Sequence, residues 1–384
     1  MSEWKKVKLD ELYEVHNGLS KGRQFFGTGF PFLTFSNVFN NWFLPDQLES
    51  LVQTTDKERE ACSIKAGDVF ITRTSETMDE LGMSSVALKD YPNATYNGFT
   101  KRLRPITNRV SPRYIGYYLR TPKFRGQFMA FSTMTTRASL ANNDLLNMEV
   151  ELPSMEIQHR IATILSRYDS LIENYQKQIK LLEEAAQRLY KEWFVDLHFP
   201  GHENTNIIDG VPEGWEKKKV GDITPIITGK KDANFGTPDG EYPFFTCSQE
   251  PIKAPSFSFD CAAVLLAGNG DFNVKLYRGR FEAYQRTYVL SPYIDSHLYL
   301  LFYTISANMT KLAAGSSGST IKFLTKGMID GINLNVPNDE ILRSFNKKVE
   351  PIQSSRESLQ SQLRLLTEAR DRLLPKLMSG EITI

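Results

Sequence analysis

The 384-residue sequence lacks the features that define several common classes of protein. It has only three cysteines, Cys62, Cys247 and Cys261, and none has the CxxC spacing of a zinc site or forms part of a disulfide framework. No run of about 18 apolar residues occurs, and the N-terminus has no apolar signal-peptide core. We therefore expect a cytoplasmic protein without a membrane segment.

An excess of charge of one sign is also missing, because 46 Lys and Arg balance 45 Asp and Glu. The net charge therefore gives no general indication of nucleic-acid binding. Such a role would depend on local groups of basic side chains. The length of the chain predicts two domains or more.

Motifs for catalysis are absent as well. The sequence has no G-x-x-x-x-G-K-[ST] phosphate-binding loop and no Asn-Pro-Pro-aromatic motif of amino-methyltransferases. His198 and His202 are four residues apart, but Pro200-Gly201 between them would break the helix that such a metal-binding pair needs. The sequence therefore favours a non-catalytic chain without a metal or cofactor of its own.

One long stretch, from Pro153 to Phe194, has the pattern of an amphipathic helix. It begins with a turn residue and the N-cap residue Ser154, and no further Pro or Gly occurs within it. Apolar residues recur at every seventh position, with a second series four residues on, which places them on one face. About 40 residues at ~1.5 Å each give a rod of roughly 60 Å. Such a rod needs an equally long packing partner.

A second copy of this pattern lies 184 residues later and begins at Pro337-Asn338. Because the heptad register is identical, we predict that the two helices pack on each other. The predicted packing residues are Ile161, Tyr168, Tyr175, Leu182, Leu189, Phe345, Ile352, Leu359, Leu366 and Leu373. Pro351 interrupts the second copy and predicts a kink or a division near residue 347, and Pro375 predicts its end or a bend.

The segments before each helix repeat too, although their polar residues differ. Gly214-Trp215 onward corresponds to Trp4 onward, and each segment has short β-type runs, an aromatic-rich helix and a hydroxyl-rich loop. We predict an α+β fold with internal two-fold pseudo-symmetry. Its parts are a mixed α/β domain at 1–152, a long helix at 153–197, a similar domain at 198–336 and a second long helix at 337–384.

Basic and hydroxyl-bearing residues gather in the loops of both domains. Arg and Gln can bind guanine and adenine edges bidentately, whereas Lys, Ser and Thr mostly bind phosphates. A solvated surface role is the simpler interpretation for any one of them, but as paired sets in two copies they favour DNA. The predicted DNA-binding residues are Lys21, Arg23, Gln24, Arg73, Lys101, Arg102, Thr136 and Arg137 in the first domain, and Lys230, Lys231, Lys275, Arg278, Arg280, Gln285, Arg286, Ser319, Thr320 and Lys322 in the second.

The alternating order of domain and helix resembles the specificity subunit of type I restriction–modification enzymes. The helix start from Leu152 to Leu165 is similar to the family's Pro-x-x-x-Glu-Gln-x-x-Ile-Ala pattern. The domain start at Trp215-Glu216 and the loop from Gly318 to Leu324 are also similar to the family. The second helix start, from Val336 to Ile341, matches the pattern less well.

This resemblance implies a division of labour among subunits. Each target-recognition domain would bind one half of a bipartite, asymmetric site on double-stranded DNA. The helices would pack antiparallel as a coiled-coil spacer that sets the gap between half-sites. Two methyltransferase subunits would dock on the chain and methylate adenine, and restriction or translocase subunits would cleave. S-adenosylmethionine, ATP and magnesium are then expected on those partners and not in this chain.

Two other functions remain open at this point. A coiled-coil adaptor that bridges two proteins without DNA recognition would explain the helices but not the paired basic loops. A nuclease or methyltransferase acting alone would need catalytic residues that the sequence does not display.

Overall fold

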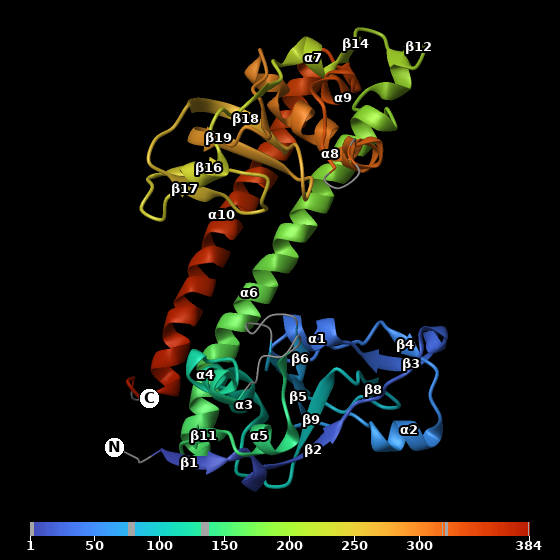
Figure 1. The fold of residues 1–384 in the computed structure, drawn as a ribbon. Helices are drawn as coiled ribbons and strands as arrows, with labels where there is room; N and C mark the ends of the chain where they lie inside the picture. Colours follow the sequence, from blue (N-terminus) through green and yellow to red (C-terminus); the bar gives the residue numbers. More distant parts are fainter. Residues whose placement is uncertain (1–3, 76–80, 132–137, 317, 319–321, 383) are drawn as a thin grey trace. The chain divides into compact units, whose positions relative to one another are not determined.

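The computed structural model describes the chain except residues 1–3, 76–80, 132–137, 317, 319–321 and 383. It divides into two compact units, one formed by Met1–Asn174 with Gln362–Ile384 and the other by Tyr175–Ser361. Each unit combines a mixed α/β domain with one half of each of two long helices, α6 (Met155–Tyr190) and α10 (Asp339–Met378) (Figure 1). No described helix is both long enough and apolar enough to cross a membrane.

The two long helices begin at the side-chain caps that the sequence predicts. Ser154 Oγ accepts a hydrogen bond from the Ile157 N–H at 3.4 Å, and Asn338 Oδ1 accepts one from the Ile341 N–H at 3.0 Å. Helix α6 ends at Tyr190 and passes into a wider π-helical turn, Lys191–Val195. Each of the predicted packing residues is buried or half-buried: Ile161, Tyr168, Tyr175, Leu182, Leu189, Phe345, Ile352, Leu359, Leu366 and Leu373.

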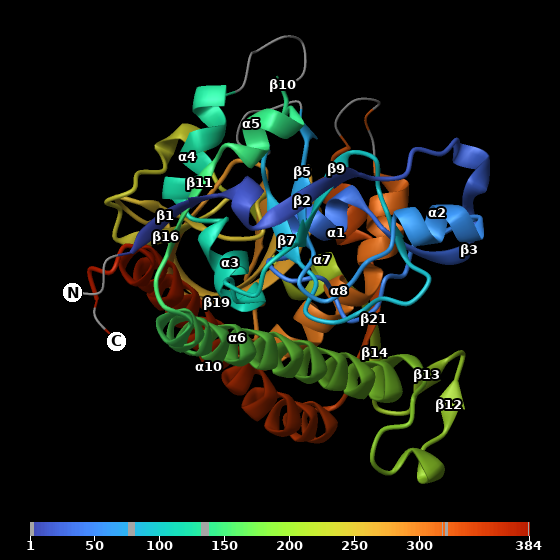
Figure 2. The ribbon, with the colours of Figure 1, turned by 90° about the horizontal axis from the view of Figure 1, so that it is seen from below.

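Contacts within each unit show that the long helices run antiparallel. In the first unit, Arg370 near the end of α10 forms an ion pair with Asp169 of α6, with Nη1 and Oδ1 2.9 Å apart. In the second unit, the Trp193 ring just after α6 lies 5.9 Å from the ring of Phe345 near the start of α10. The end of one helix therefore lies beside the start of the other, and Figure 2 shows the two side by side.

The predicted division of the second helix near residue 347 is wrong, because α10 continues without interruption through Pro351. The proline removes one backbone hydrogen bond, but packing holds the turns on either side of it. Val349 and Gln353 are buried, whereas Pro351 itself is exposed. Pro375 lies in the last turn of the helix, three residues before its end at Met378.

The domain of the first unit is built on an antiparallel four-stranded sheet in the order β2-β9-β5-β7, with a three-stranded sheet β4-β3-β8 and two short pairs, β1-β11 and β6-β10. The strands are β1 (Lys5–Lys8), β2 (Tyr13–Asn17), β3 (Phe26–Leu33), β4 (Leu51–Val52), β5 (Val69–Thr72), β6 (Thr74–Ser75), β7 (Ser84–Val86), β8 (Thr95–Tyr96), β9 (Thr100–Pro105), β10 (Ala138–Ser139) and β11 (Glu149–Leu152). The helices are α1 (Phe35–Asn40), α2 (Asp56–Ala61), α3 (Pro112–Tyr118), α4 (Pro122–Phe131) and α5 (Asn142–Leu146).

The domain of the second unit has a six-stranded sheet in the order β15-β20-β18-β19-β16-β17 and two short pairs, β12-β13 and β14-β21. The strands are β12 (Ile207–Ile208), β13 (Val211–Pro212), β14 (Glu216–Lys219), β15 (Ile227–Thr228), β16 (Tyr242–Phe245), β17 (Ile252–Ala254), β18 (Phe259–Ala267), β19 (Val274–Ala283), β20 (Thr287–Leu290) and β21 (Asn333–Val336). The helices are α7 (Val220–Ile223), α8 (Leu298–Gly315) and α9 (Lys326–Asp330).

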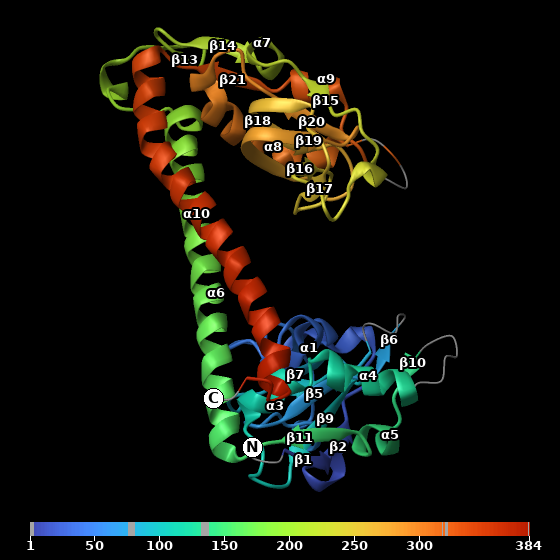
Figure 3. The same ribbon diagram turned by 90° about the vertical axis from the view of Figure 1, so that its left-hand side faces the viewer.

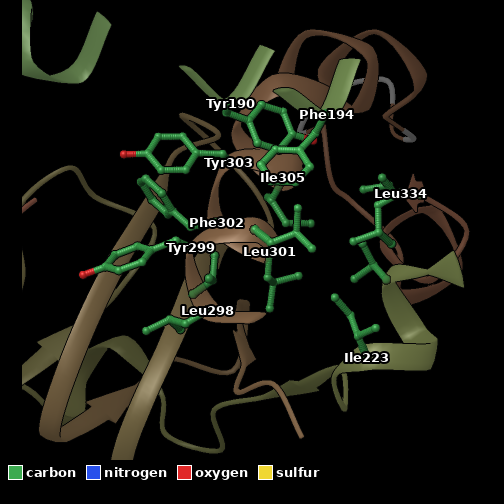
Figure 4. Packing of buried hydrophobic residues seen from close by; sticks show 14 of the residues in the cluster. Tyr190, Phe194, Ile223, Leu298, Tyr299, Leu301, Phe302, Tyr303, Ile305 and Leu334 are labelled. Carbon is green, nitrogen blue, oxygen red and sulfur yellow. The ribbon is translucent and has the colours of Figure 1, made fainter. Parts of the chain in front are cut away.

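Helix α8 forms the centre of the second unit's core. It lies against the sheet beside β18 and β19 (Figure 3). Leu301 and Tyr303 of this helix pack in one cluster with Tyr190 of α6 and with Phe194 of the π-helical turn that follows it (Figure 4). The Tyr190 hydroxyl also lies 3.0 Å from Thr304 Oγ1 within this core. The domain is thereby fixed on the helix that leads into it.

A short antiparallel strand pair closes each domain directly before a long helix. In the first unit β1 pairs with β11, and in the second β14 pairs with β21. Both closing strands run straight into the proline and cap residue that start α6 and α10. The repeated plan that the sequence predicts is therefore present in the structure.

A buried histidine lies at the start of α8 in the second unit. His297 precedes α8, is 7% exposed, and its Nδ1 has no hydrogen-bond partner among the described residues. Burial lowers the pKa of His297, the nearby Lys218 lowers it further, and Asp339 opposes the shift. A histidine whose pKa is lowered on folding stabilises the fold above its unfolded pKa and loses that contribution as the pH falls.

We therefore expect the second unit to lose stability as the pH falls below about 6.5, the ordinary pKa of histidine. Unfolding midpoints measured between pH 7.5 and pH 5.5 test this. The loss should be smaller in a His297→Gln variant, which cannot titrate. Equal losses in the two proteins would show that His297 is not the group responsible.

Candidate nucleic-acid interface

In the first unit, several loops meet at one edge of the four-stranded sheet. The N–H of Arg73, directly after β5, donates to the carbonyl of Phe99, directly before β9, at 3.0 Å. The N–H of Leu140 donates to the Arg73 carbonyl at 3.1 Å, and the N–H of Gly98 donates to the Leu19 carbonyl at 2.9 Å. Loop residues that are distant in sequence thus form one surface.

The second unit repeats this framework with different residues. The N–H of Gly268 donates to the Arg286 carbonyl at 2.8 Å, and the N–H of Leu324 donates to the Gly268 carbonyl at 2.8 Å. The N–H of Gln285 donates to the Lys231 carbonyl at 2.9 Å. The backbone arrangement is therefore common to both domains, whereas the side chains on it differ.

A glycine lets the first loop of each set approach its neighbour closely. A Cβ atom at Gly18 would lie 2.2 Å from the Asn97 carbonyl oxygen, and one at Gly229 would lie 1.8 Å from that of Ala283. No side chain fits at such distances. These two glycines hold the loops that carry Lys21 and Lys230 against the rest of the surface.

In the first unit, some of the predicted DNA-binding residues face solvent. Arg23 and Gln24 are exposed. Lys21 forms an ion pair with Glu58, with Nζ and Oε2 2.8 Å apart, and its Nζ lies 4.9 Å from the centre of the Phe25 ring. Arg73 is half-buried beside the Phe99 turn, and its Nε has no hydrogen-bond partner among the described residues.

Lys101 and Arg102, which the sequence places among the DNA-binding residues, are buried, 4% and 2% exposed. They lie on β9, a central strand paired with both β2 and β5. Lys101 Nζ bonds to the Asn142 side chain, and Arg102 donates to the Ser63 carbonyl at 2.7 Å. Burial lowers the pKa of Lys101, and the charge of Arg73 lowers it further. The structure therefore assigns these two cations to the interior of the domain, where a DNA backbone cannot reach them.

In the second unit, most of the predicted DNA-binding residues that lie in loops are exposed to solvent. Lys230, Gln285 and Arg286 are exposed, and so is Lys322. Lys231 is half-buried, with its Nζ 4.3 Å from the centre of the Phe235 ring. These side chains surround the point at which the loops meet.

Three other predicted residues of the second unit already have partners within the domain. Arg278 donates to Tyr299 Oη at 2.6 Å and forms an ion pair with Glu350 of α10 at 3.0 Å. Arg280 pairs with Asp260 at 3.1 Å. Lys275 donates to the Ser248 carbonyl at 2.8 Å, and burial lowers its pKa.

Four predicted residues lie outside the described part of the chain: Thr136, Arg137, Ser319 and Thr320.

Sequence reasoning missed the exposed aromatic residue of the first unit's surface. Phe99 is 55% exposed and lies beside Arg73. The Asn97-Gly98 turn signature directly before it was the available indication, because a residue at the tip of a tight turn seldom belongs to the core. Among the described residues, no group of three or more His, Cys, Asp or Glu side chains could hold a metal ion.

A second surface is repeated on the outer faces of the long helices. Leu181 of α6 is 63% exposed, and Leu365, the same position of α10, is 56% exposed. An exposed alanine and an exposed arginine follow at the same spacing in both copies, as Ala185 with Arg188 and as Ala369 with Arg372. Positions four and seven residues on lie on one helix face. The two helices therefore present the same small apolar and basic surface.

Comparison with known proteins gives a consistent result. Residues 1–184 and 212–355 match the family model described as the type I restriction modification DNA specificity domain. The chain is 26% identical over 416 residues to the type I restriction enzyme MjaIX specificity subunit of Methanocaldococcus jannaschii, which covers 100% of this chain and 94% of that one. It is 36% identical over 177 residues to the EcoDI specificity subunit of Escherichia coli, which covers 45% of this chain and 40% of that one.

A solved structure shares the fold. The S subunit of a type I restriction-modification system from M. genitalium aligns with a TM-score of 0.64 at 15% identity, over 98% of this chain and 96% of that one. The family model covers most of the chain, in one segment that includes the first domain and another that includes most of the second. The protein belongs to the type I restriction-modification DNA specificity family.

Proposed function

We propose that this chain recognises a bipartite, asymmetric DNA site as the non-catalytic specificity subunit of a type I restriction–modification complex. The observation that supports this best is the repeated loop surface, which has one hydrogen-bond framework and two different sets of side chains. A common framework lets two domains approach duplex DNA in the same way. Different side chains on it let them select different sequences.

The long helices would hold the two recognition domains at a fixed separation. Each domain is attached to the helices by packing and by hydrogen bonds, such as the one between Tyr190 and Thr304. Rigid attachment matters because half-sites on DNA must be met at a set distance and rotation. Two domains joined in this way also gain affinity through their effective concentration.

The repeated outer face of the helices would dock two copies of one partner, the methyltransferase subunit. Leu181 and Leu365 are exposed at matching positions, and a surface that contacts only water does not require leucine there. Two copies of one partner would each bind the same surface, which explains why the surface is repeated. In this proposal S-adenosylmethionine is bound by the methyltransferase subunits. ATP and magnesium are bound by restriction subunits, and the whole complex works in the cytoplasm.

A protein-bridging adaptor without DNA recognition is the alternative. It would account for the helices and their repeated face. It would not account for a second repeated surface with exposed cations in both domains, including Arg23 and Arg286. The two functions differ in a property that is simple to measure, the dependence of DNA affinity on salt.

We expect the complex of this chain with its methyltransferase subunits to bind DNA with an affinity that falls steeply as salt rises. Replacing Lys230 and Lys231 by alanine should lower the slope of log affinity against log salt by about 0.9 for each phosphate that the variant no longer binds. The matched control replaces Lys217 and Lys219, two exposed lysines on β14, outside the loop surface. Affinity that does not change with salt would support the adaptor.

A further inference from the structure

One turn occupies the same place in the two domains and carries a different exposed side chain in each. Residues 97–100 and 284–287 each close with a hydrogen bond, from Thr100 N–H to the Asn97 carbonyl at 3.0 Å and from Thr287 N–H to the Tyr284 carbonyl at 2.8 Å. Both threonines are buried, 0% and 2% exposed. The third residue of the turn is Phe99 in the first domain and Arg286 in the second.

The backbone on both sides of this third residue is fixed in the same way. Its carbonyl accepts the N–H of the residue that follows a central strand, which is Arg73 in the first domain and Gly268 in the second. The turn also begins at equivalent bonds, from Asn97 N–H to the Leu33 carbonyl and from Tyr284 N–H to the Phe245 carbonyl, both 3.0 Å. The two side chains therefore leave the domain surface from equivalent anchored positions.

Neither side chain has a structural task among the described residues that explains it. Phe99 is 55% exposed, whereas every aromatic residue of the first unit's core clusters is at least partly buried. The guanidinium of Arg286 is exposed and forms no ion pair with a described residue, although Arg278 and Arg280 of the same sheet both do. An exposed phenylalanine forgoes the free energy that burial of its ring would contribute, and a bound partner that covers the ring would recover it.

We propose that Phe99 and Arg286 are equivalent base-contacting residues that select different bases in the two half-sites. Arg286 would bind guanine through O6 and N7 in the major groove, which its planar pair of donors matches. Phe99 would contact the 5-methyl group of thymine, the apolar feature of the same groove. This assignment rests on the proposed function. It also names the base that we expect at one position of each half-site.

The inference can be tested with the chain in complex with its methyltransferase subunits and a library of DNA sites. Arg286→Phe should reduce the preference for guanine at one position of one half-site by roughly tenfold to a hundredfold. Phe99→Arg should replace a preference for thymine by one for guanine at one position of the other half-site. In each variant the other positions of the affected half-site should still be selected, which shows that the substituted domain is folded.

Two results would overturn the assignment. One is that Arg286→Phe weakens binding to all sequences equally, which would make Arg286 a phosphate contact. The other is a wild-type half-site without any G·C pair where Arg286 binds. In both cases the wild-type complex still selects a bipartite site, so the proposed function stands. If the wild-type complex selects no bipartite site, the proposed function fails first.

Discussion

Duplicating one heptad in each long helix is expected to lengthen the gap between the two half-sites by about three base pairs. Seven residues add ~10.5 Å of helix and keep the apolar face nearly in place, and each base pair of DNA spans ~3.4 Å. The segments to duplicate are Tyr175–Leu181 in α6 and Leu359–Leu365 in α10, which occupy the same position in the two copies of the repeat. Both must be lengthened together because the helices pack antiparallel.

The gap can be measured by selecting sites from DNA with a randomised spacer. The matched control exchanges the sequence of Tyr175–Leu181 for that of Leu359–Leu365, so that the composition changes and the length does not. We expect the control to keep the original gap. An unchanged gap in the lengthened protein would mean that the helices do not determine the spacing.

The second large effect concerns Arg120, which cross-links the first domain and has no acidic partner among the described residues. Its Nε donates to the Ser84 carbonyl at 2.7 Å, and its Nη2 donates to the carbonyls of Val38, Phe39 and Asn41 at 2.8, 3.0 and 2.8 Å. The guanidinium carbon lies 5.6 Å from the centre of the Trp42 ring. Burial lowers the pKa of Arg120 to about 10, and Arg125 contributes to the shift.

Replacing Arg120 by methionine leaves these carbonyl groups without their donor. We expect the first unit to lose about 3–5 kcal/mol of stability, a large part of the 5–15 kcal/mol typical of a domain. Denaturant unfolding measures this loss, and selection of the first half-site should weaken with it. The loss of stability in an Arg120→Lys variant should be smaller than in Arg120→Met but still measurable, because one ammonium group cannot reach all four carbonyls.

The matched control for Arg120 is Arg113, an exposed arginine whose guanidinium carbon lies 5.8 Å from the centre of the Phe43 ring. Arg113→Met should change stability by no more than about 1 kcal/mol. Similar losses in the two variants would show that the carbonyl contacts of Arg120 contribute little.

The helical frame could be predicted from sequence because its cause is local and periodic. A seven-residue apolar repeat places Ile161, Tyr168 and Leu182 on one face whatever the rest of the chain does. Caps at Ser154 and Asn338 depend only on the residues that follow them. The continuation of α10 through Pro351 depends instead on burial of Val349 by distant residues, which no local pattern displays.

The recognition surface was less predictable, because charge alone does not determine whether a side chain is exposed. Lys101 and Arg102 look like loop cations in the sequence, but they lie on a central strand and bond to Asn142 and to the Ser63 carbonyl. Arg278 forms an ion pair with Glu350, which is 72 residues away in the sequence, so its partner could not be identified from neighbouring residues. In the opposite direction, Phe99 resembles a core residue until the turn that anchors it is known.

The most direct test of the account is a map of methylated bases in DNA from cells that contain this chain with its methyltransferase subunits. We expect methylation within two short specified segments separated by a gap of fixed length and unspecified sequence. A substitution at Phe99 should change the sequence of the segment that the first domain recognises, and a substitution at Arg286 should change that of the other segment. Methylation within one continuous motif, or a pattern that does not depend on this chain, would contradict the account.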